Sequence, residues 1–108
     1  MFVVVFEVQV KAGREQDYLG LATELRPEVE AIEGFISVER FQGLARPGRL
    51  VSISYWHDDD AVKRWREHNR HHLAQLAGRR EIFEDYRITV AEVERQYGMF
   101  DRAAAPQG

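Results

Sequence analysis

The hydrophobic positions of this chain follow two periodicities, and the changes between them divide the chain into six elements. Apolar residues alternate with polar ones, or gather in β-branched and aromatic runs, in four stretches that predict strands at residues 2–10, 35–42, 50–57 and 82–93. Helical spacing predicts two helices, at residues 14–33 and from the acidic run 58–60 to Gly78. The order β-α-β-β-α-β is that of a ferredoxin-like α+β fold with a four-stranded antiparallel sheet.

Turn and helix-breaking residues refine these boundaries. Pro27 lies inside the first helix and lacks a backbone donor, which predicts a kink or a local break. Gly34 is a plausible stop after this helix, and residues 43–48 have the Pro-Gly chemistry of a hairpin loop. An aspartate in 58–60 can cap the second helix, whose pattern leaves an interruption near Asn69 open.

The sheet has apolar residues on both of its faces. Two helices can cover only one face, yet the third strand carries Val51, Ile53 and Tyr55 opposite Leu50 and Trp56. Leaving the second face in water would expose a large apolar patch. The sequence therefore predicts a homodimer in which two sheets pack together, the arrangement of a dimeric α+β barrel.

Length and composition exclude several classes of function. The 108 residues predict one domain over 1–101, followed by a disordered tail over 102–108. A net charge of -3 gives no general attraction to nucleic acid or to anionic membranes, and no apolar run approaches the roughly 20 residues of a membrane span. The absence of cysteine excludes disulfides, thiol catalysis and Cys-based metal sites. Because the N-terminus lacks a basic leader, a cytoplasmic location is expected.

Residues 65–79 hold three of the four histidines together with a tryptophan and several arginines. His68 and His72 have the i,i+4 spacing that can place two imidazoles on one metal ion. No third ligand is evident nearby in the sequence, however. Two partly exposed histidines in a charged helix are therefore expected, without a metal.

The faces of this helix decide which side chains can share a cavity. On a continuous helix Trp65, His68 and His72 form one stripe, whereas His71 lies on a different face. A break near Asn69 would turn His71 toward the same cavity as Trp65. The sequence leaves both arrangements open: His71 is a base or a surface histidine, and Trp65 is a pocket wall or a core anchor.

Three further side chains have both a structural and a binding interpretation. Trp56 at a strand end caps a core or forms a wall for a flat ligand. Arg79, which follows Gly78 at a helix end, stabilises the helix dipole or binds an anion such as a phenolate. Tyr86 and Arg87 alternate on the last strand, so one faces the helices and the other the opposite side of the sheet.

Several of these stretches resemble the antibiotic biosynthesis monooxygenase family, which belongs to the dimeric α+β barrel superfamily. The likeness covers roughly residues 2–98 and rests on Glu33 to Phe41, Ser54-Tyr55-Trp56, Trp65-Arg66, His71, Ala74-Gln75, Gly78-Arg79, Phe83 and Asp85 to Ile88. The resemblance implies the fold and the homodimer. It also implies oxygenation of an electron-rich aromatic molecule by O₂ without metal, flavin or haem.

The resemblance gives the candidate residues roles in a cofactor-independent monooxygenase for a small phenolic, quinol-like or polyketide-like aromatic metabolite. The expected catalytic residues are His71 as base or hydrogen-bond donor, with Trp56 and Trp65 as aromatic walls. The expected substrate-binding residues are Ser52, His72, Arg79 and Tyr86. The chain departs from the quinone-forming enzymes at two positions, because their asparagine falls at Ser52 and their helix tyrosine near Val62.

Two other functions remain open. A non-catalytic ligand-binding or stress-related dimer predicts that the three histidines of the second helix are mostly solvated. A haem-binding or haem-degrading protein would use Trp65, but the axial histidine of that branch falls at Gln75 and its asparagine at Phe6. His71 or His72 could ligate haem only with a shifted helix register.

Overall fold

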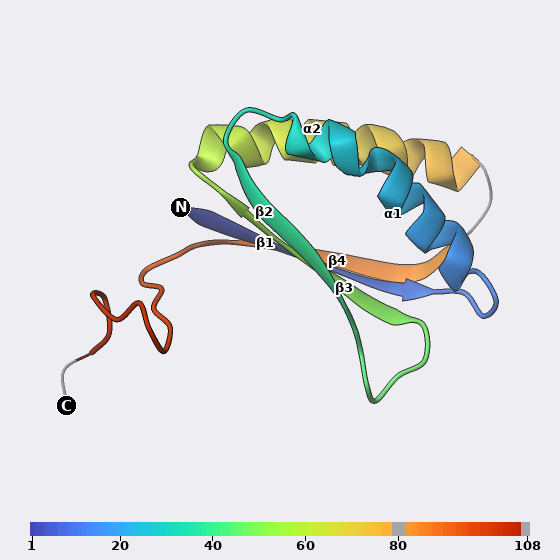
Figure 1. Ribbon diagram of the computed structural model, residues 1–108. Helices are drawn as coiled ribbons and strands as arrows, with labels where there is room; N and C mark the ends of the chain where they lie inside the picture. The colour runs from blue at the N-terminus through green and yellow to red at the C-terminus, as the bar shows by residue number, and fades with distance from the viewer. Residues whose placement is uncertain (79–81, 107–108) are drawn as a thin grey trace.

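The computed structural model describes residues 1–78 and 82–106 (Figure 1). Its elements are β1 (Phe2–Val10), α1 (Glu15–Glu30), β2 (Phe35–Gln42), β3 (Arg49–Trp56), α2 (Asp59–Gly78) and β4 (Phe83–Glu92). The predicted α+β fold and the β-α-β-β-α-β order are confirmed.

The four strands form one antiparallel sheet in the order β2-β3-β1-β4. Both helices lie on the same face of this sheet (Figure 1). Helix α1 packs over β2, and α2 packs over β1 and β3. The strand β4 is an edge strand, and its helix-side residues Tyr86, Ile88 and Val90 stay exposed.

The helix boundaries follow from local chemistry. Asp58 caps α2, because its carboxylate oxygen accepts a hydrogen bond from the Ala61 N–H at 2.8 Å. Helix α2 then continues without a break through Asn69, so the interruption left open by the sequence is not present. Helix α1 also continues through Pro27, and its ribbon changes direction along its length (Figure 1).

Gly34 allows the loop after α1 to lie against the start of α2. Its φ angle is 92°, a conformation that disfavours other residues. A Cβ atom at this position would lie 2.5 Å from the Cβ of Ala61. The Gly34 carbonyl also accepts a hydrogen bond from the His57 N–H at 2.8 Å, which ties the loop to the end of β3.

Two groups of buried side chains separate the sheet from the helices. The first, called here the packed core, consists of Val4, Trp56, Ala61, Val62 and Trp65. The second, called here the cavity core, consists of Phe6, Val8, Val10, Tyr18, Leu50 and Ile82. They lie toward opposite ends of β1, so the space between helices and sheet has two differently filled halves.

The other face of the sheet is not covered by either helix (Figure 1). The odd-numbered residues of β1 and β3 point to this face and are half-buried: Val3, Val5, Val51, Ile53 and Tyr55. The chain after β4 leads away from the sheet and carries Tyr97, Met99 and Phe100 exposed. Within residues 1–78 and 82–106, no helix is both long and apolar enough to cross a membrane.

Candidate functional site

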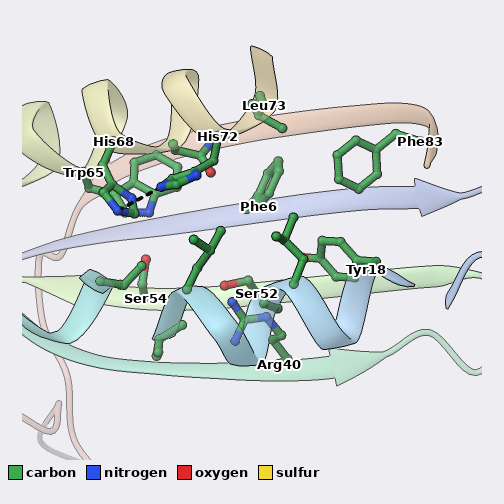
Figure 2. A pocket seen from close by; sticks show the side chains of 16 residues that line it. Phe6, Tyr18, Arg40, Ser52, Ser54, Trp65, His68, His72, Leu73 and Phe83 are labelled. Atoms are coloured by element: carbon green, nitrogen blue, oxygen red, sulfur yellow. Dashed lines mark hydrogen bonds between the residues drawn. The ribbon is translucent and has the colours of Figure 1, made fainter. Parts of the chain in front are cut away.

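A cavity of about 70 Å³ lies between the two helices and the sheet (Figure 2). Its walls come from β1, α1, β2, β3, α2 and the start of β4, so every element of the fold contributes to it. This volume holds about five water molecules. It is smaller than the roughly 300–1,000 Å³ of pockets for drug-sized ligands, so a larger ligand requires the helices to move apart.

The floor of the cavity carries polar groups from neighbouring strands. Arg40 comes from β2, and Ser52 and Ser54 come from the adjacent β3. The Arg40 Nε atom is buried and has no hydrogen-bond partner among the described residues. An unpaired buried donor costs about 1–3 kcal/mol, and more for a charged group. A ligand oxygen that accepts this N–H would remove that cost.

Tyr18 of α1 approaches the same arginine from above the sheet (Figure 2). Burial raises the pKa of the Tyr18 phenol above its ordinary value of 10.0, while the charge of Arg40 and its hydrogen bond to the phenol oppose this rise. Tyr18 therefore keeps its proton at neutral pH. The pair offers one cationic and one neutral hydrogen-bonding group to the cavity.

The mouth of the cavity is lined by one stripe of α2. Trp65, His68 and His72 project from consecutive turns toward the cavity, as expected for a continuous helix (Figure 2). The Nε2 atoms of His68 and His72 lie 3.2 Å apart. From α1, Oε1 of Glu28 lies 3.4 Å from Nε2 of His68 and 3.8 Å from Nε2 of His72. This carboxylate joins the two helices at the mouth.

The structure brings only part of the predicted set to the cavity. Ser52, Trp65 and His72 line it. His71 is instead exposed on another face of α2, because the helix is unbroken, and its ring packs 5.6 Å from that of His72. Trp56 lies in the packed core with no exposed surface, with its ring centroid 6.4 Å from that of Trp65.

The remaining two predicted residues lie apart from these. Tyr86 is on the helix side of the edge strand, about half exposed, with its ring centroid 5.9 Å from that of Phe6. The orientation of Tyr86 toward the helix side resolves the alternative that the sequence left open for β4. Arg79 falls outside the described residues.

Four residues of the site were missed by reasoning from the sequence: Tyr18, Glu28, Arg40 and Ser54. For Arg40 a signal exists, because alternation along β2 puts it on the same face as Val38 and hence under the helices. Tyr18 fits the helical periodicity of the first predicted helix, and that pattern does not distinguish an apolar position from a polar group of a cavity. Glu28 has no local signal, since it meets a histidine 40 residues later in the chain.

The family model of the antibiotic biosynthesis monooxygenases matches residues 1–76. This match covers well over half of the chain, including the helices and strands that form most of the cavity. The chain therefore belongs to the antibiotic biosynthesis monooxygenase family.

Two relatives of known name are similar over most of this chain. Jasmonate monooxygenase ABM of Pyricularia oryzae is 42% identical over 93 residues, which are 86% of this chain and 43% of the relative. The chain thus spans less than half the length of that relative. The protein YqjZ of Bacillus subtilis is 33% identical over 95 residues, which are 88% of this chain and 81% of the relative.

A crystal structure from Deinococcus radiodurans, named as an antibiotic biosynthesis monooxygenase, superposes with a TM-score of 0.77. The superposition covers 92% of this chain and 98% of the other, at 15% sequence identity. At this level of identity the superposition shows the shared fold alone.

Proposed function

We propose that this chain is a cofactor-independent monooxygenase for a small, mostly apolar molecule that carries an oxyanion. The observation that supports the proposal most directly is the buried Arg40 Nε at the floor of the cavity, which has no hydrogen-bond partner within residues 1–78 and 82–106. A phenolate is the oxyanion expected for the phenolic, quinol-like or polyketide-like aromatic substrates of the family. A carboxylate is the alternative, since the relative from Pyricularia oryzae is named for jasmonate.

Arg40 and Tyr18 would bind the oxyanion. A charge-assisted hydrogen bond from a guanidinium is stronger than a neutral one, especially where water is excluded. Tyr18 supplies a second donor, because its raised pKa keeps the phenol protonated. For a phenolic substrate, stabilising the anion favours the phenolate, which is the form that donates an electron to O₂, whereas for a carboxylate the contact only positions the substrate.

The rest of the cavity would exclude water and accept the proton. Phe6, Trp65 and Leu73 form apolar walls, so reactive oxygen intermediates are shielded from solvent. His68 and His72 line the mouth, which makes them better placed than His71 to take a proton from a bound phenol. Oxidation of a CH₂ group to C=O uses one oxygen atom of O₂ and releases the other as water. The substrate then supplies all four electrons.

The experiment is to measure O₂ uptake with an anthrone and with jasmonate, for the wild-type chain and for Arg40→Gln. We expect kcat/KM to fall by about 10²-fold or more in Arg40→Gln, because a charge-assisted contact in a dry site is lost. Arg66→Gln, at an exposed position of α2, is the matched control. Equal turnover in Arg40→Gln and wild type would contradict the proposal.

The proton acceptor is tested by comparing His68→Ala, His72→Ala and His71→Ala in the same assay. The geometry predicts that loss of a mouth histidine lowers the rate about 10²-fold. A loss confined to His71→Ala would instead support the role expected from the sequence.

We also propose that the chain forms a homodimer through the uncovered face of the sheet. Val5, Ile53 and Tyr55 would lie in the centre of that interface, where they would leave contact with water. Light scattering at micromolar concentration should give twice the chain mass of 12.6 kDa, and Ile53→Glu should give the monomer. A monomeric wild-type protein would contradict this proposal.

A ligand-binding dimer without catalysis is the second candidate, and the exposure of His71 favours it. The same assay separates the two, because this candidate predicts ligand binding without O₂ uptake. For haem, the branch asparagine falls at Phe6, which is buried with its ring against those of Trp65 and Tyr86. A haemin titration without a Soret shift would remove that alternative.

A further inference from the structure

Glu28, His68 and His72 form a cluster at the cavity mouth, of which the proposed oxygenation uses only a histidine as proton acceptor. The two histidines come from successive turns of α2, and the glutamate comes from α1. All three side chains direct one ligand atom to the same point: Nε2 of each ring and Oε1 of the carboxylate. The histidines are mostly shielded from solvent, with 21% and 15% of their side chains exposed.

The spacing of the three atoms is that of metal ligands. Two ligand atoms at about 2.0–2.1 Å from a tetrahedral ion lie about 3.3–3.4 Å apart. The observed separations are 3.2 Å between the two nitrogens, and 3.4 and 3.8 Å from the carboxylate oxygen to the nitrogens. A single ion can therefore reach all three atoms with side-chain shifts of a few tenths of an ångström.

One proton shared between the Nε2 atoms of His68 and His72 leaves at least one of the three atom pairs without a hydrogen bond. If His68 Nε2 is unprotonated, its lone pair faces the carboxylate oxygen at 3.4 Å. If only His68 Nε2 is protonated, the lone pair of His72 faces the same oxygen at 3.8 Å. If both nitrogens are protonated, two N–H groups face each other at 3.2 Å. A cation between the three atoms removes the conflict, because all of them then act as donors of lone pairs.

We propose that Glu28, His68 and His72 bind one divalent transition metal ion of the Co²⁺, Ni²⁺ or Zn²⁺ type. Two imidazoles and one carboxylate suit these ions better than Mg²⁺ or Ca²⁺, which prefer oxygen ligands. Three protein ligands leave a coordination position for water or for a donor atom of a bound molecule. Because the ligands come from both helices, the ion also fastens α1 to α2 at the mouth of the cavity.

This site goes beyond the proposed oxygenation, which is not routed through the ion. A histidine whose Nε2 lone pair binds the ion cannot also take a proton there, so the proton-acceptor role belongs to the metal-free protein. The proposed site also departs from the metal-free site expected from the sequence. That expectation rested on the lack of a third ligand near His68 and His72. The third ligand is Glu28, which the fold supplies from the other helix.

The test is a calorimetric titration of chelator-treated protein with Zn²⁺, in the absence of substrate. Wild type should bind one ion per chain, and His68→Ala and His72→Ala should each weaken binding by about 10²-fold. Glu28→Gln should weaken it by about tenfold. The matched controls are His57→Ala and Glu24→Gln, at exposed positions outside the cluster, which should change affinity less than about twofold.

Circular dichroism shows whether each variant is folded, and the visible spectrum of bound Co²⁺ gives a second readout of coordination. The proposal is overturned if wild type binds no Zn²⁺ at about 0.1 mM, or if folded His68→Ala and His72→Ala both bind as wild type does. Since no substrate is present, neither result bears on Arg40 or on O₂ uptake. If the oxygenation proposal is contradicted, the result for Zn²⁺ binding still stands.

Discussion

The packed core and the cavity core lie between the same helices and sheet, but they differ in how completely side chains fill them. In the packed core, Trp56 and Ala61 are completely buried, and the Trp56 indole N–H donates to Ser54 Oγ at 2.9 Å. In the cavity core, Tyr18 and Phe6 surround open volume, and Arg40 Nε has no hydrogen-bond partner in the described part of the chain. The packed core is closely filled and its indole donor is paired, whereas the cavity core has open volume and a donor available to a ligand.

This difference indicates that the two ends of β1 have different roles. The packed core fixes the start of α2 against the sheet, so that the stripe of Trp65, His68 and His72 is held in register. The cavity core can then be less well packed without loss of the fold. Polar groups that weaken an interior are thereby placed where a ligand can satisfy them.

Trp56→Ala is expected to have the largest effect, and it tests whether the packed core is the better packed of the two. We expect a loss of about 3–5 kcal/mol in the free energy of unfolding, because a completely buried aromatic leaves a cavity that the surrounding chain fills poorly. Leu25→Ala in the wall of the existing cavity is the control, and should cost less than about 2 kcal/mol since Leu25 is only partly buried. Urea denaturation measures both. Equal losses would mean that the two halves are equally well packed.

Gly34→Ala tests the packed core, because it adds a side chain to the loop that lies against Ala61. The added Cβ would lie 2.5 Å from Ala61 Cβ at a φ angle of 92°, so we expect a loss of about 1–3 kcal/mol. Gly20→Ala is the control, because it lies within α1 and a Cβ there meets no atom within 4 Å. Thermal unfolding should show a lower Tm for Gly34→Ala only. A Tm unchanged from wild type would contradict the tight contact between this loop and α2.

Tyr18→Phe tests whether the phenol in the cavity core is buried, through the pH dependence of the free energy of unfolding. The folded protein has a raised Tyr18 pKa, so the unfolded chain loses the phenol proton first as pH rises above about 10. The contribution of Tyr18 to stability is fully present below that pH and is lost through the folded-state pKa. The stability of wild type relative to Tyr18→Phe should therefore decline as the pH rises above about 10. Urea denaturation at several pH values tests this, and a pH-independent difference would contradict burial of the phenol.

The sequence by itself determined the element order, the fold class and the stripe of α2. These features depend on periodicity and on local capping, both of which can be read along the chain. Asp58 and Gly34 are examples, since each acts on residues close by or on its own backbone. The stripe of Trp65, His68 and His72 needed only that α2 be continuous.

Only the tertiary structure decided which residues share a site. Arg40 meets Tyr18 because β2 lies beneath α1, and Glu28 meets His68 across 40 residues of sequence because α1 lies beside α2. The tertiary structure also places His71 outside the cavity, because one residue along a helix turns a side chain by about 100°. Periodicity fixes the face on which a side chain lies, but the partner on that face depends on how elements pack.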